Sequence, residues 1–182
     1  IFCTSVEGVR GQKAVDWRLV DAIAKPAQFA DAVAQHAQQL AAQSQRAGAA
    51  AKGQGVALKA LQKKTAADSL NYEYVNVDID RAKRTATLTV SAPKAAVPST
   101  IESIQQAGDS WYPLQMAREL DDAILCLRSN ELDIGTWLLK TAGDTALALQ
   151  SDAVLVQHQA HWLVNETIGL LRRTLARLDV SS

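Results

Sequence analysis

The fold is decided by two short runs of alternating residues, Val75-Asn76-Val77-Asp78-Ile79-Asp80 and Thr85-Ala86-Thr87-Leu88-Thr89-Val90. Successive side chains of a strand point to opposite faces, so each run has one apolar and one polar face. The polar segment between the runs, residues 80–83, suits a turn. The stretch therefore predicts a β-hairpin with one buried face.

Downstream of the hairpin the sequence predicts helices. Pro93 and Pro98 end the second strand, and the capping-box spacing of residues 99–102 predicts a short helix. After a loop at residues 108–112, Pro113 starts a longer helix. The apolar side chains of this helix recur at helical spacing, and they are Ala117, Leu120, Ile124 and Leu127.

The remaining residues predict two strands and a final helix. Residues 135–141 predict a strand whose nearly continuous apolar centre suits a sheet that is covered on both faces. After a turn at residues 142–144, residues 145–149 predict another short strand. The last element is a long helix with an inner apolar stripe, formed by Val164, Ile168, Leu171, Leu175 and Leu178. Such a mixture of strands and helices predicts the α/β class.

The first part of the chain has a different pattern. Residues 15–24 predict a short extended run, and Pro26 suits the first turn of a helix that reaches about Gln45. Residues 47–55 hold three glycines and predict a linker. Residues 56–70 fit either a short helix, which we prefer, or a strap over a neighbouring element.

Composition and charge exclude several classes of function. The chain of 182 residues is 48% hydrophobic and 21% charged, as soluble globular proteins are. Its formal net charge is +0, so no long-range field attracts nucleic acid or an acidic membrane surface. No apolar run reaches the ~18 residues of a membrane span, and no signal peptide is evident. Cys3 and Cys126 lack metal or redox spacing, which favours free thiols in a reducing cytoplasm.

Two segments resemble the crotonase superfamily of enoyl-CoA hydratases and isomerases, and they occur in inverted order. Residues 14–21 resemble the segment that closes a module, with Arg18 in place of the family's usual glycine. Residues 78–94 resemble the hairpin that opens a module and ends in Pro-Lys. We therefore expect an internal fragment across the junction of two modules. Residues 1–46 close the first, residues 47–71 link them, and residues 72–182 begin a partial crotonase-type module.

A further stretch of sequence resembles one kind of member within the superfamily. Residues 109–123 are similar to a superfamily member that joins two crotonase-like modules in one polypeptide. That resemblance implies a cytoplasmic carbon–carbon lyase of aerobic benzoate degradation, which opens the ring of a dihydrodiol of benzoyl-CoA and releases formate. It also implies an aromatic acyl-CoA substrate and no cofactor beyond the CoA that this substrate carries. A homo-oligomer is expected, with no nucleic-acid or membrane partner.

The resemblance also implies where the chemistry lies. In the superfamily, two backbone N–H groups form an oxyanion hole, which holds the thioester carbonyl and stabilises an enolate. The loop at residues 140–150 lacks the family's Phe-x-Ala-Gly-x-Asp pattern, and the other donors and the acid–base carboxylates are expected outside this chain. We therefore assign no catalytic and no metal-binding residue and leave cofactor-binding residues unknown. The isolated chain is expected to be inactive.

Two other functions stay open. In the first, residues 72–182 form a non-catalytic scaffold or oligomerisation module, whose altered loop serves packing. In the second, the chain is a fragment of an enoyl-CoA hydratase or isomerase, which the Trp111-Tyr112-Pro113 stretch makes the weaker alternative.

The polar candidates for a local site have simpler structural interpretations. His158 and His161 are expected on one helical face with Glu166 beyond them, but the further ligands that a metal needs are not evident. We therefore expect ordinary surface histidines. Glu119, Asp121 and Asp122 lie near Arg118 and Arg128, which favours a solvated, salt-bridging face over an acid–base pair. Arg118 and Asp122 are one turn apart and are expected to pair.

The remaining candidates are aromatic, small or sulfur-containing residues. Trp111 and Tyr112 suit stacking on a ligand, but we favour an aromatic pair that anchors its loop to the core. Gly143 would let backbone approach a ligand, although one Gly-Asp turn is a weak signal. Cys126 lies between Leu125 and Leu127 and is expected to be a core residue.

Overall fold

The computed structural model describes residues 8–43 and 55–179, and these form two compact units that divide between Gly55 and Val56. The first unit contains a short helix α1 (Gln12–Asp16), a 3-10 turn η2 (Pro26–Gln28) and a helix α2 (Phe29–Gln43). The predicted helix after Pro26 is therefore confirmed. The extended run predicted at residues 15–24 is wrong, because α1 and a series of turns occupy this segment. The glycine-rich linker predicted at residues 47–55 falls outside the described residues except for Gly55.

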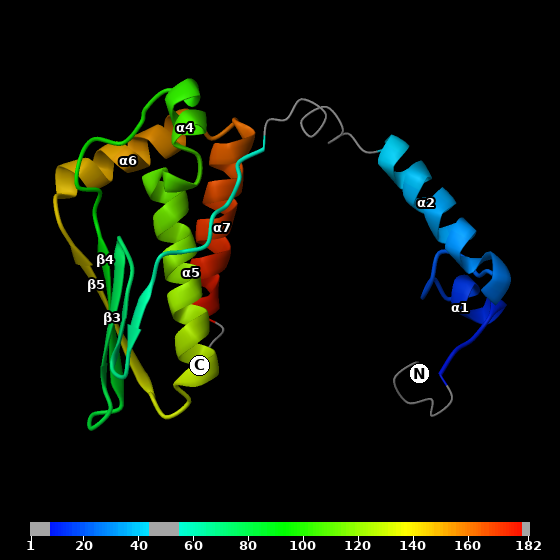
Figure 1. Ribbon diagram of the computed structural model, residues 1–182, viewed down its shortest axis with the longest axis horizontal. Helices are drawn as coiled ribbons and strands as arrows, with labels where there is room; N and C mark the ends of the chain where they lie inside the picture. Colours follow the sequence, from blue (N-terminus) through cyan, green and yellow to red (C-terminus); the bar gives the residue numbers. More distant parts are fainter. Residues whose placement is uncertain (1–7, 44–54, 180–182) are drawn as a thin grey trace. The chain divides into compact units, whose positions relative to one another are not determined.

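The second unit is built on a five-stranded sheet (Figure 1). Its strands lie in sequence order, and they are β1 (Lys64–Ala66), β2 (Ser69–Asn71), β3 (Val75–Asp80), β4 (Thr85–Ser91) and β5 (Thr136–Ala142). Neighbours from β1 to β4 pair antiparallel, whereas β5 lies parallel to β4. The predicted hairpin is confirmed as β3–β4.

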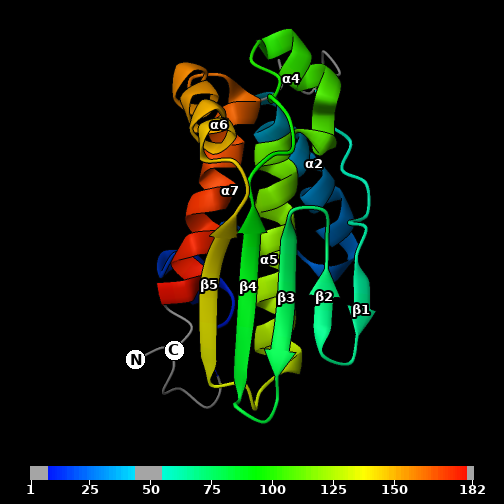
Figure 2. The same ribbon diagram turned by 90° about the vertical axis from the view of Figure 1, so that its left-hand side faces the viewer.

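Five helical segments accompany the sheet. They are α4 (Ile101–Ala107), the 3-10 turn η3 (Gly108–Ser110), α5 (Tyr112–Asn130), α6 (Thr145–Gln157) and α7 (Trp162–Asp179). Figure 2 shows α5 and α7 on one face of the sheet, with α4 and α6 grouped at the carboxyl end of β5. The connection from β4 to its parallel neighbour runs through α4 and α5, as a parallel crossover requires. Helices with a mixed sheet confirm the α/β class.

Two apolar clusters form the core of the second unit. The first lies between the sheet and α5 and includes Val77, Leu88 and Ile124. The second lies where α4, α5, α6 and α7 meet, and Trp111 is fully buried in it. The alternating apolar residues that predicted the hairpin are the residues that pack in the first cluster, because every second residue of β3 and β4 faces α5.

The opposite face of the sheet is uncovered within this unit. We expected a strand covered on both faces at residues 135–141, and this expectation is wrong for the part of the chain that the structure describes. Every residue of β5 except the half-buried Trp137 is exposed. An apolar run predicts that a strand is buried once all the elements that pack on it are present. The pattern alone does not show which elements those are.

Two further predictions of secondary structure are wrong. Residues 56–63 form neither helix nor strand, and β1 and β2 follow them, so the helix that we preferred at residues 56–70 is absent from the described chain. The other interpretation, a strap over a neighbour, agrees with the packing of Val56 on the second cluster and of Leu61 on the first. Residues 145–149 begin α6 instead of forming a strand, because Asp144 caps the helix and accepts a hydrogen bond from the N–H of Ala146 at 2.7 Å.

The predicted final helix and its stripe are partly correct. α7 is present, but its buried residues are Leu163, Val164, Thr167 and Thr174, and Leu175 is exposed. The most extensive helix–helix contact of α7 is with α5. Among the described residues, no helix combines the length and apolar character needed to cross a membrane.

Candidate functional site

The best candidate for a site is the corner where β5 ends and α6 begins, called here the β5–α6 corner. It is a hollow of about 330 Å³ at the carboxyl ends of the parallel strands β4 and β5. Its lining comes from Val90, Ala92, Tyr112, Ala148 and residues 141–145. Ligands of open α/β sheets bind outside the carboxyl ends of parallel strands, so the topology favours this end of the sheet.

Gly143 sets the geometry of the corner. Its φ of +98° lies in a region that favours glycine. A Cβ at this position would lie 3.0 Å from the Cβ of Ala92 and 3.2 Å from its backbone N. The two segments are held together because the N–H of Ala92 donates to the carbonyl of Ala142 at 2.8 Å. Gly143 therefore lets β5 turn sharply into α6 without a clash.

The corner has the donor chemistry of an oxyanion site. Within the described chain, the backbone N–H groups of Gly143 and Asp144 have no hydrogen-bond partner. The N-terminus of α6 adds the positive end of a helix dipole, which favours negative charge at this place. The arrangement can therefore accept a carbonyl oxygen that gains negative charge.

The corner has little acid–base capacity of its own. Its titratable residues are Tyr112 and Asp144. Burial raises the pKa of Tyr112 to about 12, with smaller contributions from Asp152 and Tyr74, and its hydroxyl donates to the carbonyl of Ser91 at 3.0 Å. The carboxylate of Asp144 is occupied as the cap of α6. Tyr112 therefore keeps its proton at neutral pH, and the corner offers donors without a free base.

The histidines are not arranged as predicted. His158 follows the last residue of α6, and its Nε2 lies 2.8 Å from the carbonyl oxygen of Ser99. His161 lies in the turn before α7, where its ring stacks at a tilt against Trp162. The expected shared helical face is wrong, because a turn separates α6 from α7. In the described ranges no group of three or more potential metal ligands occurs.

The carboxylates of α5 are paired, but with partners that the sequence did not indicate. Asp121 accepts from Nε of Arg177 on α7 at 2.8 Å. Asp122 accepts from Nζ of Lys63 at 2.8 Å and from the hydroxyl of Tyr72 at 2.6 Å. The predicted pair of Arg118 with Asp122 is therefore wrong.

Arg118 and Glu119 have structural roles instead. Arg118 binds the strap, where its guanidinium donates to the carbonyl of Lys59 at 2.6 Å and lies 3.8 Å from the carboxylate of Asp109. Glu119 is only 2% exposed, which contradicts the predicted solvated face. A sequence pattern could not have shown this, because the groups that bind Glu119 are backbone N–H groups of the distant hairpin.

The aromatic pair fits its structural interpretation, whereas the cysteine fits the predicted core position only in part. Trp111 is fully buried in the second cluster, and Tyr112 packs edge-on against Tyr74 with ring centroids 4.8 Å apart. The predicted anchoring role is therefore confirmed. Cys126 packs against the first cluster but is only partly buried, with its Sγ 3.4 Å from Nζ of Lys63.

Comparison with known proteins shows a similar enzyme of known activity. The chain is 51% identical, over all 182 residues, to the benzoyl-CoA-dihydrodiol lyase of Aromatoleum evansii. The resemblance predicted from residues 109–123 is thereby confirmed. The chain spans 32% of the length of that enzyme, about a third. No family model matches the chain.

Proposed function

We propose that the chain is part of a carbon–carbon lyase that acts on a dihydrodiol of benzoyl-CoA. The main support for the proposal is the sequence identity of 51% to benzoyl-CoA-dihydrodiol lyase, which extends over all 182 residues. The crotonase-like segments at residues 14–21 and 78–94 support it, since that superfamily acts on CoA thioesters. A cytoplasmic location and a homo-oligomeric state belong to the same proposal.

The chemistry requires a stabilised enolate. As the ring opens next to the thioester, negative charge moves onto the carbonyl oxygen, and fixed N–H donors lower the energy of that state. One such donor is worth about 3 kcal/mol of barrier where water is excluded. The β5–α6 corner has the unpaired N–H groups of Gly143 and Asp144 and the N-terminus of α6 for this purpose.

Proton transfer requires groups from elsewhere in the polypeptide. The corner holds Tyr112, which stays protonated, and Asp144, which caps its own helix. We therefore propose that the acid–base carboxylates lie in the parts of the enzyme outside these residues. No cofactor is proposed beyond the CoA of the substrate.

The test is a comparison of two substrates with the full-length protein that contains this chain. We expect it to open the dihydrodiol of benzoyl-CoA, with formate released in equal amount, and to hydrate crotonyl-CoA at least a hundred times more slowly, on the order of the discrimination that a dedicated site achieves. Rapid hydration of crotonyl-CoA without ring opening would assign the chain to the hydratase alternative.

A non-catalytic scaffold is the second candidate, and the occupied carboxylate of Asp144 favours it. Asn caps helices about as well as Asp, so Asp144→Asn removes the charge and keeps the cap. If the corner only packs, the rate of ring opening is unchanged in this variant and in Asp152→Asn, a matched change at an exposed residue of the same helix. A tenfold or larger loss in Asp144→Asn alone would rule out the scaffold.

A further inference from the structure

The strap of residues 56–63 ends in a lysine that lies over a thiol of α5. Nζ of Lys63 is 3.4 Å from Sγ of Cys126 and 2.8 Å from Oδ2 of Asp122. Asp122 and Cys126 are four residues apart on α5, so their side chains lie on the same face of the helix. One amine from a distant segment therefore contacts both groups.

The carboxylate of Asp122 fixes this amine in place. Its Oδ2 also accepts from the hydroxyl of Tyr72 at 2.6 Å, and Tyr72 is itself buried. The side chains of Lys63 and Asp122 are each 35% exposed, so the ammonium keeps contact with water. The amine is therefore held beside the thiol and can still release its proton to solvent.

The thiol is open to a small oxidant. Cys126 is only partly buried, and it lines a hollow of about 200 Å³ together with Lys63 and Ser69. One water molecule occupies about 30 Å³ in the liquid, so the hollow also admits hydrogen peroxide, which is only slightly larger. Cysteines that peroxide oxidises are solvent-accessible in this way.

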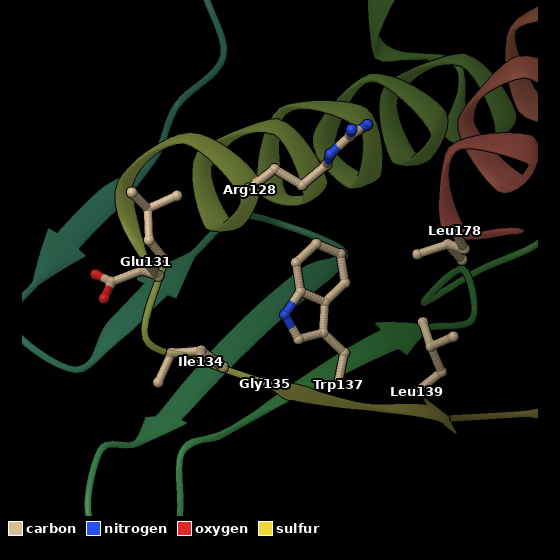
Figure 3. A pocket seen from close by; sticks show the side chains of 8 residues that line it. Arg128, Glu131, Ile134, Gly135, Trp137, Leu139 and Leu178 are labelled. Atoms are coloured by element: carbon tan, nitrogen blue, oxygen red, sulfur yellow. The ribbon is translucent and has the colours of Figure 1, made fainter. Parts of the chain in front are cut away.

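A second acidic residue of this hollow is bound elsewhere. Glu131 also lines a larger hollow, of about 520 Å³, between the end of α5 and β5. Figure 3 shows its carboxylate turned away from the indole of Trp137. The carboxylate accepts from Arg81 at 2.7 Å. Glu131 is therefore already paired, and Asp122 is the carboxylate that holds Lys63.

The amine of Lys63 is placed to react with an oxidised sulfur. Among the described residues Cys126 is the one cysteine, so the structure brings no second thiol to it. A sulfenic acid is an electrophile, and nitrogen nucleophiles displace its oxygen to give a sulfenamide. The lysine side chain is flexible, so a small movement closes the gap of 3.4 Å.

We propose that Lys63 and Cys126 form a redox-sensitive sulfenamide link, which joins the strap to α5 when the protein meets hydrogen peroxide. In the first step the O–O bond breaks, one oxygen goes to Sγ to form the sulfenic acid, and water leaves. In the second step the amine of Lys63, after loss of a proton to solvent, attacks Sγ. The N–S bond forms, the S–O bond breaks, and a second water leaves. The thiol is oxidised by two electrons and one peroxide is reduced.

Peptide mapping of the full-length protein by mass spectrometry, before and after treatment with hydrogen peroxide, tests the proposal. We expect two peptides joined through Lys63 and Cys126, lighter by about 2 Da than the sum of the separate peptides because two hydrogen atoms are lost. Dithiothreitol should reverse the link. Oxidation of Cys126 to a sulfinate or a disulfide, with Lys63 unmodified, would overturn the proposal. A thiol that peroxide leaves unchanged would also overturn it.

A substitution that keeps the charge identifies the nucleophile. Lys63→Arg retains a cation for Asp122, but a guanidinium stays protonated and does not attack sulfur. We expect no link in this variant and several-fold more labelling of Cys126 by dimedone, which traps sulfenic acids. Lys64→Arg is the matched control at the next, exposed residue and should form the link as wild type does. Equal linking or equal labelling in the two variants would contradict the role of Lys63.

The link should also restrain the strap. We expect hydrogen exchange in residues 56–63 to slow several-fold after peroxide treatment, because a covalent bond then holds their far end, and to recover after reduction. Cys126→Ser should show no change on treatment. Unchanged exchange in protein that carries the link would contradict the restraint. Every one of these measurements is made without substrate, so the outcome does not depend on the proposed activity.

Discussion

Glu119 is enclosed between α5 and the start of β3. Its Oε2 accepts from the backbone N–H groups of Tyr74 at 2.7 Å and Val75 at 3.2 Å, and its Oε1 accepts from the side chain of Gln115 at 2.9 Å. These two N–H groups are the first donors of the hairpin strand and have no ladder partner there. One carboxylate therefore joins the longest helix of the unit to its sheet.

Replacement of Glu119 tests this role. Glu119→Leu leaves the two N–H groups unpaired in a low-dielectric place, so we expect the free energy of unfolding to fall by about 2–3 kcal/mol. Glu119→Gln keeps an acceptor oxygen and should lower the free energy of unfolding by less. Urea unfolding followed by circular dichroism measures both changes.

A matched substitution at an exposed glutamate separates the loss of the buried hydrogen bonds from the general effect of replacing Glu by Leu. Glu102 is an exposed carboxylate on α4, and Glu102→Leu should change stability by no more than about 0.5 kcal/mol. Equal losses at the two positions would contradict the structural role of Glu119.

At the scale of elements, the strap of residues 56–63 is held by side chains of α5. Its far end is fixed by Lys63, which pairs with Asp122, and Tyr72 binds the same carboxylate oxygen. Burial opposes the ionisation of Asp122, but the hydrogen bonds from Lys63 and Tyr72 outweigh it and lower the pKa of this carboxyl. The hydrogen bond to Asp122 raises the pKa of Lys63 in turn.

The lowered pKa makes the contribution of Asp122 depend on pH with a definite sign. A carboxyl whose pKa is lower in the folded state stabilises the fold above its unfolded pKa, which is about 3.9, and loses this contribution as pH falls through the folded value. We expect the stability difference between wild type and Asp122→Asn to stay constant from about pH 7 to 5 and to shrink below about pH 4. Urea unfolding at a series of pH values measures it.

Lys63→Met provides the control in a double-mutant cycle. In that background the additional loss from Asp122→Asn should be smaller, because Lys63 no longer stabilises the carboxylate. A difference that is unaffected by pH and by Lys63 would contradict the pairing of the strap with α5.

The elements also show how far the sequence determines the fold. The β3–β4 hairpin was predictable because alternation and a polar turn are local signals. The β5 strand was predictable for the same reason, but its exposure was not, since burial depends on which elements are present to cover it. In α6, Ala and Leu are good helix formers and Asp144 is a good cap, so these local signals favoured the helix over the strand that we predicted.

The candidate site was only partly predictable. Gly143 was recognised as a place where backbone could approach a ligand, and the structure adds its φ of +98° and its contact with Ala92. The pairings of Asp122 with Lys63 and of Asp121 with Arg177 were not predictable, because they join residues 59 and 56 positions apart. Spacing within one helix indicates only neighbours on that helix.

At the scale of the whole molecule, the central proposal is that these residues form part of a lyase for the dihydrodiol of benzoyl-CoA. The most direct test exchanges the matching segment of the Aromatoleum evansii enzyme, 32% of its length, for this chain. If the claim is correct, the folded chimera opens the dihydrodiol ring at a rate within about tenfold of the parent, a difference of about 1.4 kcal/mol in barrier. A chimera that folds and assembles like the parent but shows no ring opening would contradict it.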